Sequence, residues 1–379
     1  MSQWPGMFDA HLEVAPPLSD EQLLQVPAKR GVLALLAADG KPILLLTAAD
    51  IRARLRSRLA EVEEGQRKKT ADLRGITRTI TWKLSAGHFE TDLNYFELAR
   101  AIWPQTYAEL LAWRKPVFVH VDPQEPYPHF SRSREVFARA GQYVGPFESA
   151  PSADKFIQAL EDAFDLCRDL ACLRQSPNGP PCSYLQMGRC LGPCCGKVSM
   201  EEYRQIVARA ASFATGQRAD FRAEMERQMK QAAGALAFER AGGLKTRLER
   251  LGEFDREPYR FVSPAEAFCY VIIGPRSRKV LSAFLVHGAR VANWGGLDYP
   301  LQESQISALL AAAAGAQAQP ATDDADRLRM GLVSQYLFCG GDKRGLILPI
   351  HAELTAESLT AAIESMAAPL GVAKPAKPQ

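Results

Sequence analysis

The cysteines are the residues of this sequence whose type and spacing most clearly suggest chemistry. Six of the eight lie between positions 167 and 195, four of them in the stretch CSYLQMGRCLGPCCGK at 182–197. Cys172, Cys182, Cys190 and Cys194 are separated by nine, seven and three residues. Structural zinc sites use pairs two to four residues apart, and only the last pair comes near that spacing. Thiolates from a loop-rich segment also suit an iron–sulfur cluster, and buried reduced thiols are a third interpretation.

A run of arginines is a second candidate site. The stretch ADIRARLRSRLAEV at 49–62 predicts a helix that begins after Asp50, and its cationic residues are Arg52, Arg54, Arg56 and Arg58. Even spacing distributes these side chains around the helix, so they cannot all face one ligand. Some are then simply solvated, and the others are candidates for contacts with DNA phosphates.

Composition sets the broad class of the protein. A hydrophobic content of 47% and a charged content of 23% are typical of a globular chain, and 379 residues predict several domains. The net charge of +3 is too small to identify a nucleic-acid partner by itself. No apolar run approaches the roughly 20 residues of a membrane span, and the N-terminus lacks the features of a secretion signal. We therefore expect a cytoplasmic protein with reduced thiols, which argues against disulfides.

The elements that would position these residues alternate between strands and helices, so we predict an α+β, multidomain fold. GVLALLAADGKPILLLTA at 31–48 predicts a β-hairpin, and residues 89–103 predict a helix that ends before Pro104. Strands are expected at 115–122, 141–147 and 345–350, a strand meander at 266–295, and helices at 302–315 and 323–337. From Met200 to about Phe254 the spacing of apolar residues predicts helices with a turn between two of them.

The cysteine segment continues into a motif that resembles the UvrC family, the incision subunit of bacterial nucleotide excision repair. Residues 182–203 reproduce, almost position for position, the family pattern C-x5-G-x-C-x2-P-C-x-G-x-V-S-x-E-E-Y. In that family the cysteines are ligands of an iron–sulfur cluster. The resemblance therefore favours an iron–sulfur cluster of the 4Fe–4S type, bound by Cys172, Cys182, Cys190 and Cys194.

The helical region resembles the UVR motif of the same family, which docks against a helical hairpin of the partner helicase UvrB. Lys245 and Thr246 stand where the pattern has Arg and Asp. The resemblance implies a UvrB-like helicase as a partner, and a purely internal helical hairpin is the alternative. The residues that we expect to contact this partner are Met225, Leu236, Phe238, Glu239, Leu244 and Leu248.

The N-terminal region resembles a GIY-YIG nuclease domain whose catalytic residues are largely replaced. Gly31-Val32-Leu33 and Leu44-Leu45-Leu46 stand where the family has its two tyrosine-bearing motifs. Only Arg54 and Glu97 match catalytic positions, with Glu97 as the metal ligand. A carboxylate without a tyrosine or lysine beside it does not easily activate a nucleophile. The resemblance implies a DNA-binding protein that does not cut; the alternative is an active endonuclease that requires Mg²⁺.

The resemblance also implies a division of the chain. Full-length relatives continue into an RNase H-like nuclease and helix-hairpin-helix motifs, which we expect this chain to lack. The predicted divisions are an N-terminal tail (1–28), a degenerate GIY-YIG domain (29–110), a linker with the cysteine segment (111–200), a UVR hairpin (201–254), a C-terminal α/β domain (255–365) and a disordered tail (366–379).

Overall fold

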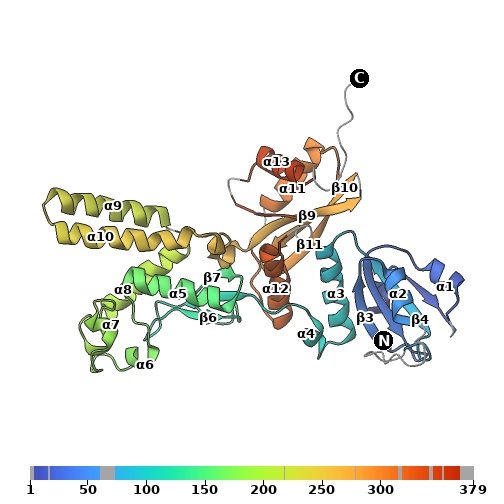
Figure 1. The fold of residues 1–379 in the computed structure, drawn as a ribbon, viewed down its shortest axis with the longest axis horizontal. Coiled ribbons are helices and arrows are strands. Elements are labelled where there is room, and N and C mark those ends of the chain that lie inside the picture. Colours follow the sequence, from blue (N-terminus) through green and yellow to red (C-terminus); the bar gives the residue numbers. More distant parts are fainter. Residues whose placement is uncertain are drawn as a thin grey trace, which may run out of the picture.

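The computed structural model of the chain is elongated, with a helical hairpin at one end and a small sheet domain at the other (Figure 1). The structure describes residues 4–15, 18–59, 73–216, 218–277, 279–314, 318–340, 345–351 and 354–367. Within these residues the strands form three four-stranded sheets, each with its own helices. The fold is therefore α+β and multidomain, as predicted. None of the described helices combines the length and the hydropathy of a membrane span.

The first sheet is built around the predicted hairpin. Its strand order is β1 (Ala10–Glu13), β4 (Thr79–Leu84), β2 (Gly31–Leu36) and β3 (Pro42–Ala48), all antiparallel. The segment 1–28, expected as an N-terminal tail, contains a strand of this sheet and a helix. Residues 10–13 pair with 79–82 and form an edge of the sheet, and α1 (Asp20–Gln25) follows with a capping box at Ser19.

The helices of this domain cover both faces of the sheet. On one face Leu33 and Leu35 pack with α2 (Ile51–Leu59) through Ile51 and Leu55. On the other face Val32 and Ala34 pack with Leu98 and Ala99 of α3 (His88–Ile102). Alternation along β2 thus directs neighbouring residues to different helices. A short helix, α4 (Tyr107–Leu110), follows α3.

The second sheet carries the cysteine segment and the base of the helical hairpin. Its order is β6 (Ser131–Ser133), β5 (Val117–Val121), β7 (Gln142–Phe147) and β8 (Ser263–Pro264). One hydrophobic core joins this sheet to the helices α5 (Ala150–Phe164), α8 (Met200–Ala214), α9 (Arg218–Gly234) and α10 (Phe238–Leu251). Between α5 and α8 lie the short elements α6 (Leu170–Leu173), α7 (Ser183–Gln186) and a 3₁₀ turn (Pro193–Cys195).

The third sheet forms the centre of the molecule. Its order is β11 (Arg290–Asp298), β10 (Val280–His287), β9 (Cys269–Ser277) and β12 (Leu346–Pro349), again antiparallel. The helices α11 (Glu303–Ala314) and α13 (Ala356–Ala367) cover one face. The other face packs against α12 (Asp324–Phe338) and α3. The tail predicted for 366–379 lies outside the described residues from 368 onward, and Met366 and Ala367 end α13.

The junction between the linker and α12 is closely packed. The indole Nε1 of Trp113 donates to the carbonyl oxygen of Leu328 at 2.9 Å. A side chain at Gly331 would place its Cβ 2.0 Å from the carbonyl oxygen of Arg114. Glycine at 331 therefore lets the helix lie directly against the linker backbone.

We predict that Gly331→Ala destabilises the protein by about 2–3 kcal/mol, because the added methyl group must separate α12 from the linker. Gly242→Ala in α10 is the matched control, since nothing lies within 4 Å of its Cβ position. That variant is expected to be neutral or to stabilise by up to about 1 kcal/mol through helix propensity. Urea unfolding of the two variants measures both effects, and equal stabilities would contradict the close packing.

Candidate functional site

Glu97 lies at the contact between the first domain and the third sheet, where it forms an ion pair. Its Oε1 accepts hydrogen bonds from Nε and Nη2 of Arg329 on α12, both at 3.0 Å. Arg100 is more distant, with Nη1 3.7 Å from Oε2. Arg329 also pairs with Asp326 at 3.0 Å and lies over the ring of Phe96. Glu97, the candidate metal ligand, is therefore paired with the guanidinium group of Arg329.

Arg54, the second candidate catalytic residue, is on a different side of the domain. Its helix α2 covers the face of β2 formed by Leu33 and Leu35, whereas α3 covers the opposite face. Arg54 is exposed to solvent. The structure thus does not bring Arg54 and Glu97 together across one site.

The strands that would carry the catalytic tyrosines are part of the hydrophobic core. Leu33 is buried with Ile51 and Leu55, and Leu45 is buried with Leu98. Leucine at these positions contributes apolar packing and offers no hydroxyl group for proton transfer.

The arginines of α2 have different surroundings. The guanidinium of Arg52 donates to the carbonyl oxygens of Val26 at 2.6 Å and Leu24 at 3.0 Å, so it fixes the end of α1. Arg54 and Arg56 are exposed, and Arg58 is partly buried. Contact of this helix with DNA stays a prediction, for which Arg54 and Arg56 are the more accessible residues.

The cysteine segment folds as a series of short turns. Cys172 lies in α6, Cys182 precedes α7, and Cys194 lies in the following 3₁₀ turn. Cys190 and Cys194 are buried, whereas Cys172 and Cys182 are partly exposed. No set of three or more His, Cys, Asp or Glu side chains in the described residues is arranged to hold a single metal ion.

The pKa of Cys190 is lowered by its surroundings in the segment. Its interaction with Cys167 lowers the pKa of Cys190 and raises that of Cys167, and the thiol of Cys167 donates to the carbonyl oxygen of Asp169 at 3.4 Å. The backbone N–H of Gly192 also donates to Cys190 Sγ at 3.4 Å. Burial raises the pKa of Cys194 to about 11. Cys167, which the sequence analysis did not include in the ligand set, is thus in direct contact with it.

The helical hairpin α9–α10 separates the six predicted partner-binding residues into two groups. Leu236, Phe238 and Glu239 are exposed at the tip, with 73% of Leu236 and 67% of Phe238 accessible. Met225 is buried, and Leu244 and Leu248 pack against the core of the second domain. The second group therefore holds the hairpin in place, and only the first is available to a partner.

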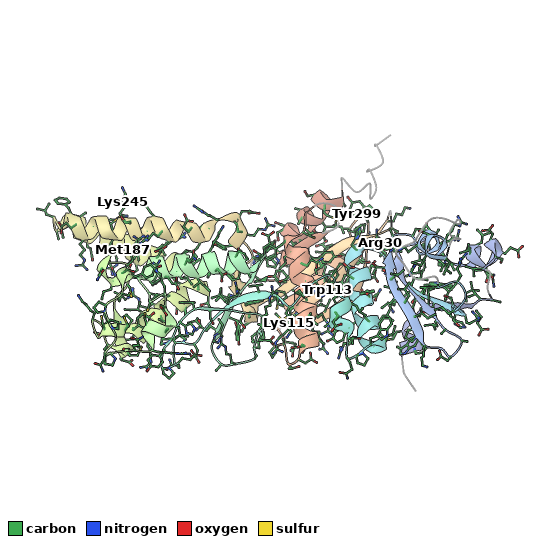
Figure 2. The ribbon with its side chains drawn as sticks, turned by 60° about the horizontal axis from the view of Figure 1, so that its bottom comes forward. Arg30, Trp113, Lys115, Met187, Lys245 and Tyr299 are labelled. Atoms are coloured by element: carbon green, nitrogen blue, oxygen red, sulfur yellow. The ribbon has the colours of Figure 1, made fainter. Side chains whose placement is uncertain are left out.

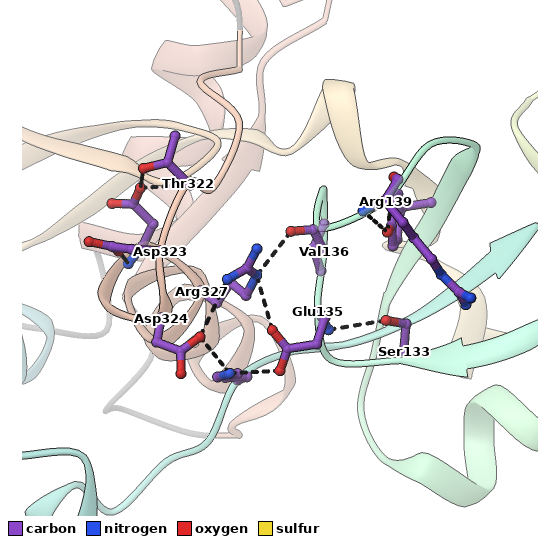
Figure 3. A network of polar contacts seen from close by, with 11 residues as sticks. Ser133, Glu135, Val136, Arg139, Thr322, Asp323, Asp324 and Arg327 are labelled. Atoms are coloured by element: carbon purple, nitrogen blue, oxygen red, sulfur yellow. Dashed lines mark hydrogen bonds and ion pairs between the residues drawn. The ribbon is translucent and has the colours of Figure 1, made fainter.

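A further polar cluster joins the second domain to α12, and the sequence analysis missed it (Figure 3). Lys115 Nζ contacts Glu135 Oε1 and Asp324 Oδ1, each at 2.7 Å. Arg327 contacts the same Asp324 at 3.3 Å and donates to the carbonyl oxygen of Val136 at 3.1 Å. Lys115 and Asp324 are 209 positions apart in the sequence, and Glu97 and Arg329 are 232 positions apart. Neither contact therefore belongs to a local sequence motif.

Parts of the chain are similar to known proteins. Residues 117–213, from β5 to α8, match the model of the UvrC/Cho excinuclease middle domain. The chain is 27% identical to the UvrABC system protein C of Moorella thermoacetica over 69% of its own length and 44% of the relative. It is 25% identical to the protein of that name from Syntrophomonas wolfei, over 76% of the chain and 48% of the relative.

The chain is therefore similar to UvrC proteins, and residues 117–213 match the middle domain of that family. A third relative, from Desulforudis audaxviator, is 29% identical over 60% of the chain and 36% of its own length. The chain thus spans about half, or less, of the length of the curated relatives that it matches. No solved structure matches it.

If Glu97 stabilises the domain contact, removing its charge weakens the fold. We predict that Glu97→Gln lowers the free energy of unfolding by about 1–3 kcal/mol, because Arg329 loses its ionised acceptor in a partly buried contact. Glu109→Gln, on the exposed surface of α4, is the control and is expected to be neutral. A double-mutant cycle with Arg329→Gln measures the coupling energy, and a value near zero would contradict a structural role for the pair.

Proposed function

We propose that the chain is a nucleotide excision repair protein that binds DNA and a UvrB-like helicase and does not itself cut DNA. The observation that carries this proposal is the ion pair of Glu97 with Arg329. The only carboxylate at a matching catalytic position is thereby assigned to the contact between two domains. The similarity of the chain to UvrABC system protein C supports the repair function.

The chemistry required for cutting has little support in the first domain. A metal-dependent nuclease needs a ligand set for its ion and a group that activates the nucleophile. Leu33 and Leu45 are core residues, and Arg54 lies on the far side of the sheet from α3. The four strands of the third sheet carry a single carboxylate, Asp298, at the end of β11.

The tip of the hairpin supports docking of a protein partner. Leu236 has a φ of 57°, in the left-handed region, where residues other than glycine are strained by about 1–2 kcal/mol. Its side chain is also exposed, so it contributes no packing that would offset this strain. Glycine or asparagine would suit the turn better. Leucine at this position is explained by an apolar contact with a partner, to which Phe238 would add.

We further propose that Cys172, Cys182, Cys190 and Cys194 bind an iron–sulfur cluster. The donor set fits, because the thiols come from one loop-rich segment and Cys190 already accepts a backbone N–H at 3.4 Å. A single zinc ion bound by the same thiolates is the alternative. When bound, the cluster would crosslink the short turns between α5 and α8. Cys167, which is buried in the same core as Cys190, would lie beside the cluster.

The proposed function predicts binding without incision. We expect the chain to bind a UvrB-type helicase and to leave ultraviolet-damaged plasmid uncut in the presence of UvrA, UvrB, ATP and magnesium. Leu236→Asn suits the left-handed turn but removes the apolar contact, so it should weaken helicase binding about tenfold or more without unfolding the hairpin. Binding is measured by calorimetry and incision by gel electrophoresis.

Leu24→Asn is the matched control, because Leu24 is also an exposed leucine, 61% accessible, but lies on α1 in the first domain. It is expected to leave helicase binding unchanged. Incision that is lost in Glu97→Ala would show that the degenerate site still cuts, and the proposal of a non-cutting protein would then be wrong. Equal effects of the two leucine variants would argue against docking at the tip.

Metal analysis tests the cluster. Protein purified without oxygen should contain about four iron and four sulfide per chain, with the broad visible absorption of such a cluster. Cys190→Ala should lose most of the iron, whereas Cys339→Ala, in α12's C-terminal turn, should retain it. One zinc per chain in place of iron would contradict the assignment.

A further inference from the structure

A cavity of about 240 Å³ lies between the first domain and the third sheet, and the proposed function makes no use of it. Its walls are largely apolar and include Phe89 of α3 together with Ile272 and Phe284 of the third sheet. The rings of Phe89 and Phe284 are in edge contact, with centroids 5.3 Å apart. The cavity is therefore formed by the contact of two domains, a common location for ligand sites.

One side of this cavity presents groups that attract an anion. Arg30 lines it, and its Nη1 lies 3.3 Å from Nδ1 of His88. Figure 2 shows Arg30 where the first domain meets the third sheet. Among the described residues no carboxylate forms an ion pair with Arg30, which lies beside the His88 ring. Arg276, near the end of β9, is exposed and follows Pro275 in the cavity wall.

The N-terminus of α3 opens into the same cavity. The helix begins at His88 after Gly87, which provides no side-chain cap. The N–H groups of the first helical turn have no acceptor within the helix, and together they carry a partial positive charge. Glu90 also lines the cavity, and its Oε2 accepts the N–H of Ala86 at 2.7 Å. Its negative charge opposes anion binding, so removal of this charge is expected to strengthen the binding of an anion.

A buried hydroxyl group provides independent evidence for a polar ligand. Ser282 lies on β10, is only 5% exposed, and lines the cavity. Its neighbours on the strand are apolar, and within the described residues its side chain makes no hydrogen bond to protein. The Ser282 hydroxyl is therefore available to a ligand atom in the cavity.

We propose that this cavity binds the 5′-phosphate end of a nucleotide. The phosphate would lie between Arg30 and the N-terminus of α3, which is a favourable arrangement for phosphate oxygens. The apolar walls at Phe89, Ile272 and Phe284 would cover part of the sugar and base, with Ser282 donating to a polar atom. At about 240 Å³ the cavity is larger than a phosphate needs but smaller than a typical pocket for a drug-sized ligand. A free mononucleotide and the phosphorylated end of a DNA strand share this chemistry.

Calorimetric titration of the full chain with thymidine 5′-monophosphate tests the proposal. Arg30→Gln should weaken binding about tenfold or more, because a charged donor is lost, and Ser282→Ala should weaken it by roughly threefold to tenfold. Glu90→Gln keeps an oxygen acceptor for Ala86 and removes the opposing charge, so it should strengthen binding by a few-fold. Opposite effects of the Arg30 and Glu90 variants cannot result from a general loss of folding.

Further titrations identify the source of the phosphate. Thymidine and inorganic phosphate should each bind more weakly than the nucleotide, and a 5′-phosphorylated oligonucleotide is compared with its 5′-hydroxyl form. Binding of the mononucleotide supports a free nucleotide as ligand, and binding of the phosphorylated oligonucleotide alone supports a strand end. Arg132→Gln, in the second domain, is the control and should bind as wild type. No binding of either phosphorylated probe, or affinities that the three cavity variants leave unchanged, would overturn the proposal.

Discussion

The burial of α3 on two sides is the constraint on which the arrangement of the first and third sheets depends. Leu98 and Ala99 pack on the first sheet, whereas Phe89 and Phe96 pack with residues of the third sheet and α12. Each fully buried aromatic side chain contributes about 1.5–3 kcal/mol, so this helix holds the two domains together. A carboxylate at such a contact must be paired. Arg329 provides that pairing for Glu97, so the residue that the sequence predicts as a metal ligand is part of a domain contact.

The elements that could be predicted from sequence are those with a strong local pattern. The hairpin β2–β3, the helices α3 and α12 and the strand β12 were found because their apolar residues recur with a clear period. The strand β4 was not predicted, although TITWKL alternates polar and apolar residues as a half-buried strand does. The partner of Glu97 could not be predicted at all, since Arg329 is 232 positions away and only the packing of α12 on α3 brings it there. Leu236 and Phe238 are exposed, as residues that contact a partner must be, and their role in binding stays a prediction.

The second domain connects the cysteine segment to the hairpin through α5. The backbone N–H of Cys167 donates to the hydroxyl oxygen of Tyr203 on α8 at 3.1 Å, and the N–H of Leu191 donates to the carbonyl oxygen of Asp165 at 3.0 Å. Asp165 also pairs with Arg247 of α10, and Arg250 donates to the carbonyl oxygen of Asp162 at 2.8 Å. A cluster that fixed the cysteine segment would therefore also fix the base of the hairpin, while its tip stayed clear of the rest of the molecule (Figure 1).

Two features that suit a molecule outside the chain lie in separate places. The strained, exposed Leu236 is at the tip of the hairpin, and the Ser282 hydroxyl faces the cavity beside α3. At the domain contacts, by contrast, Trp113, Lys115 and Arg327 find polar partners within the chain. The side chain of Leu236 gains little packing from the chain itself, because it is exposed. The two features differ in kind: one fits an apolar protein surface, the other a small polar ligand.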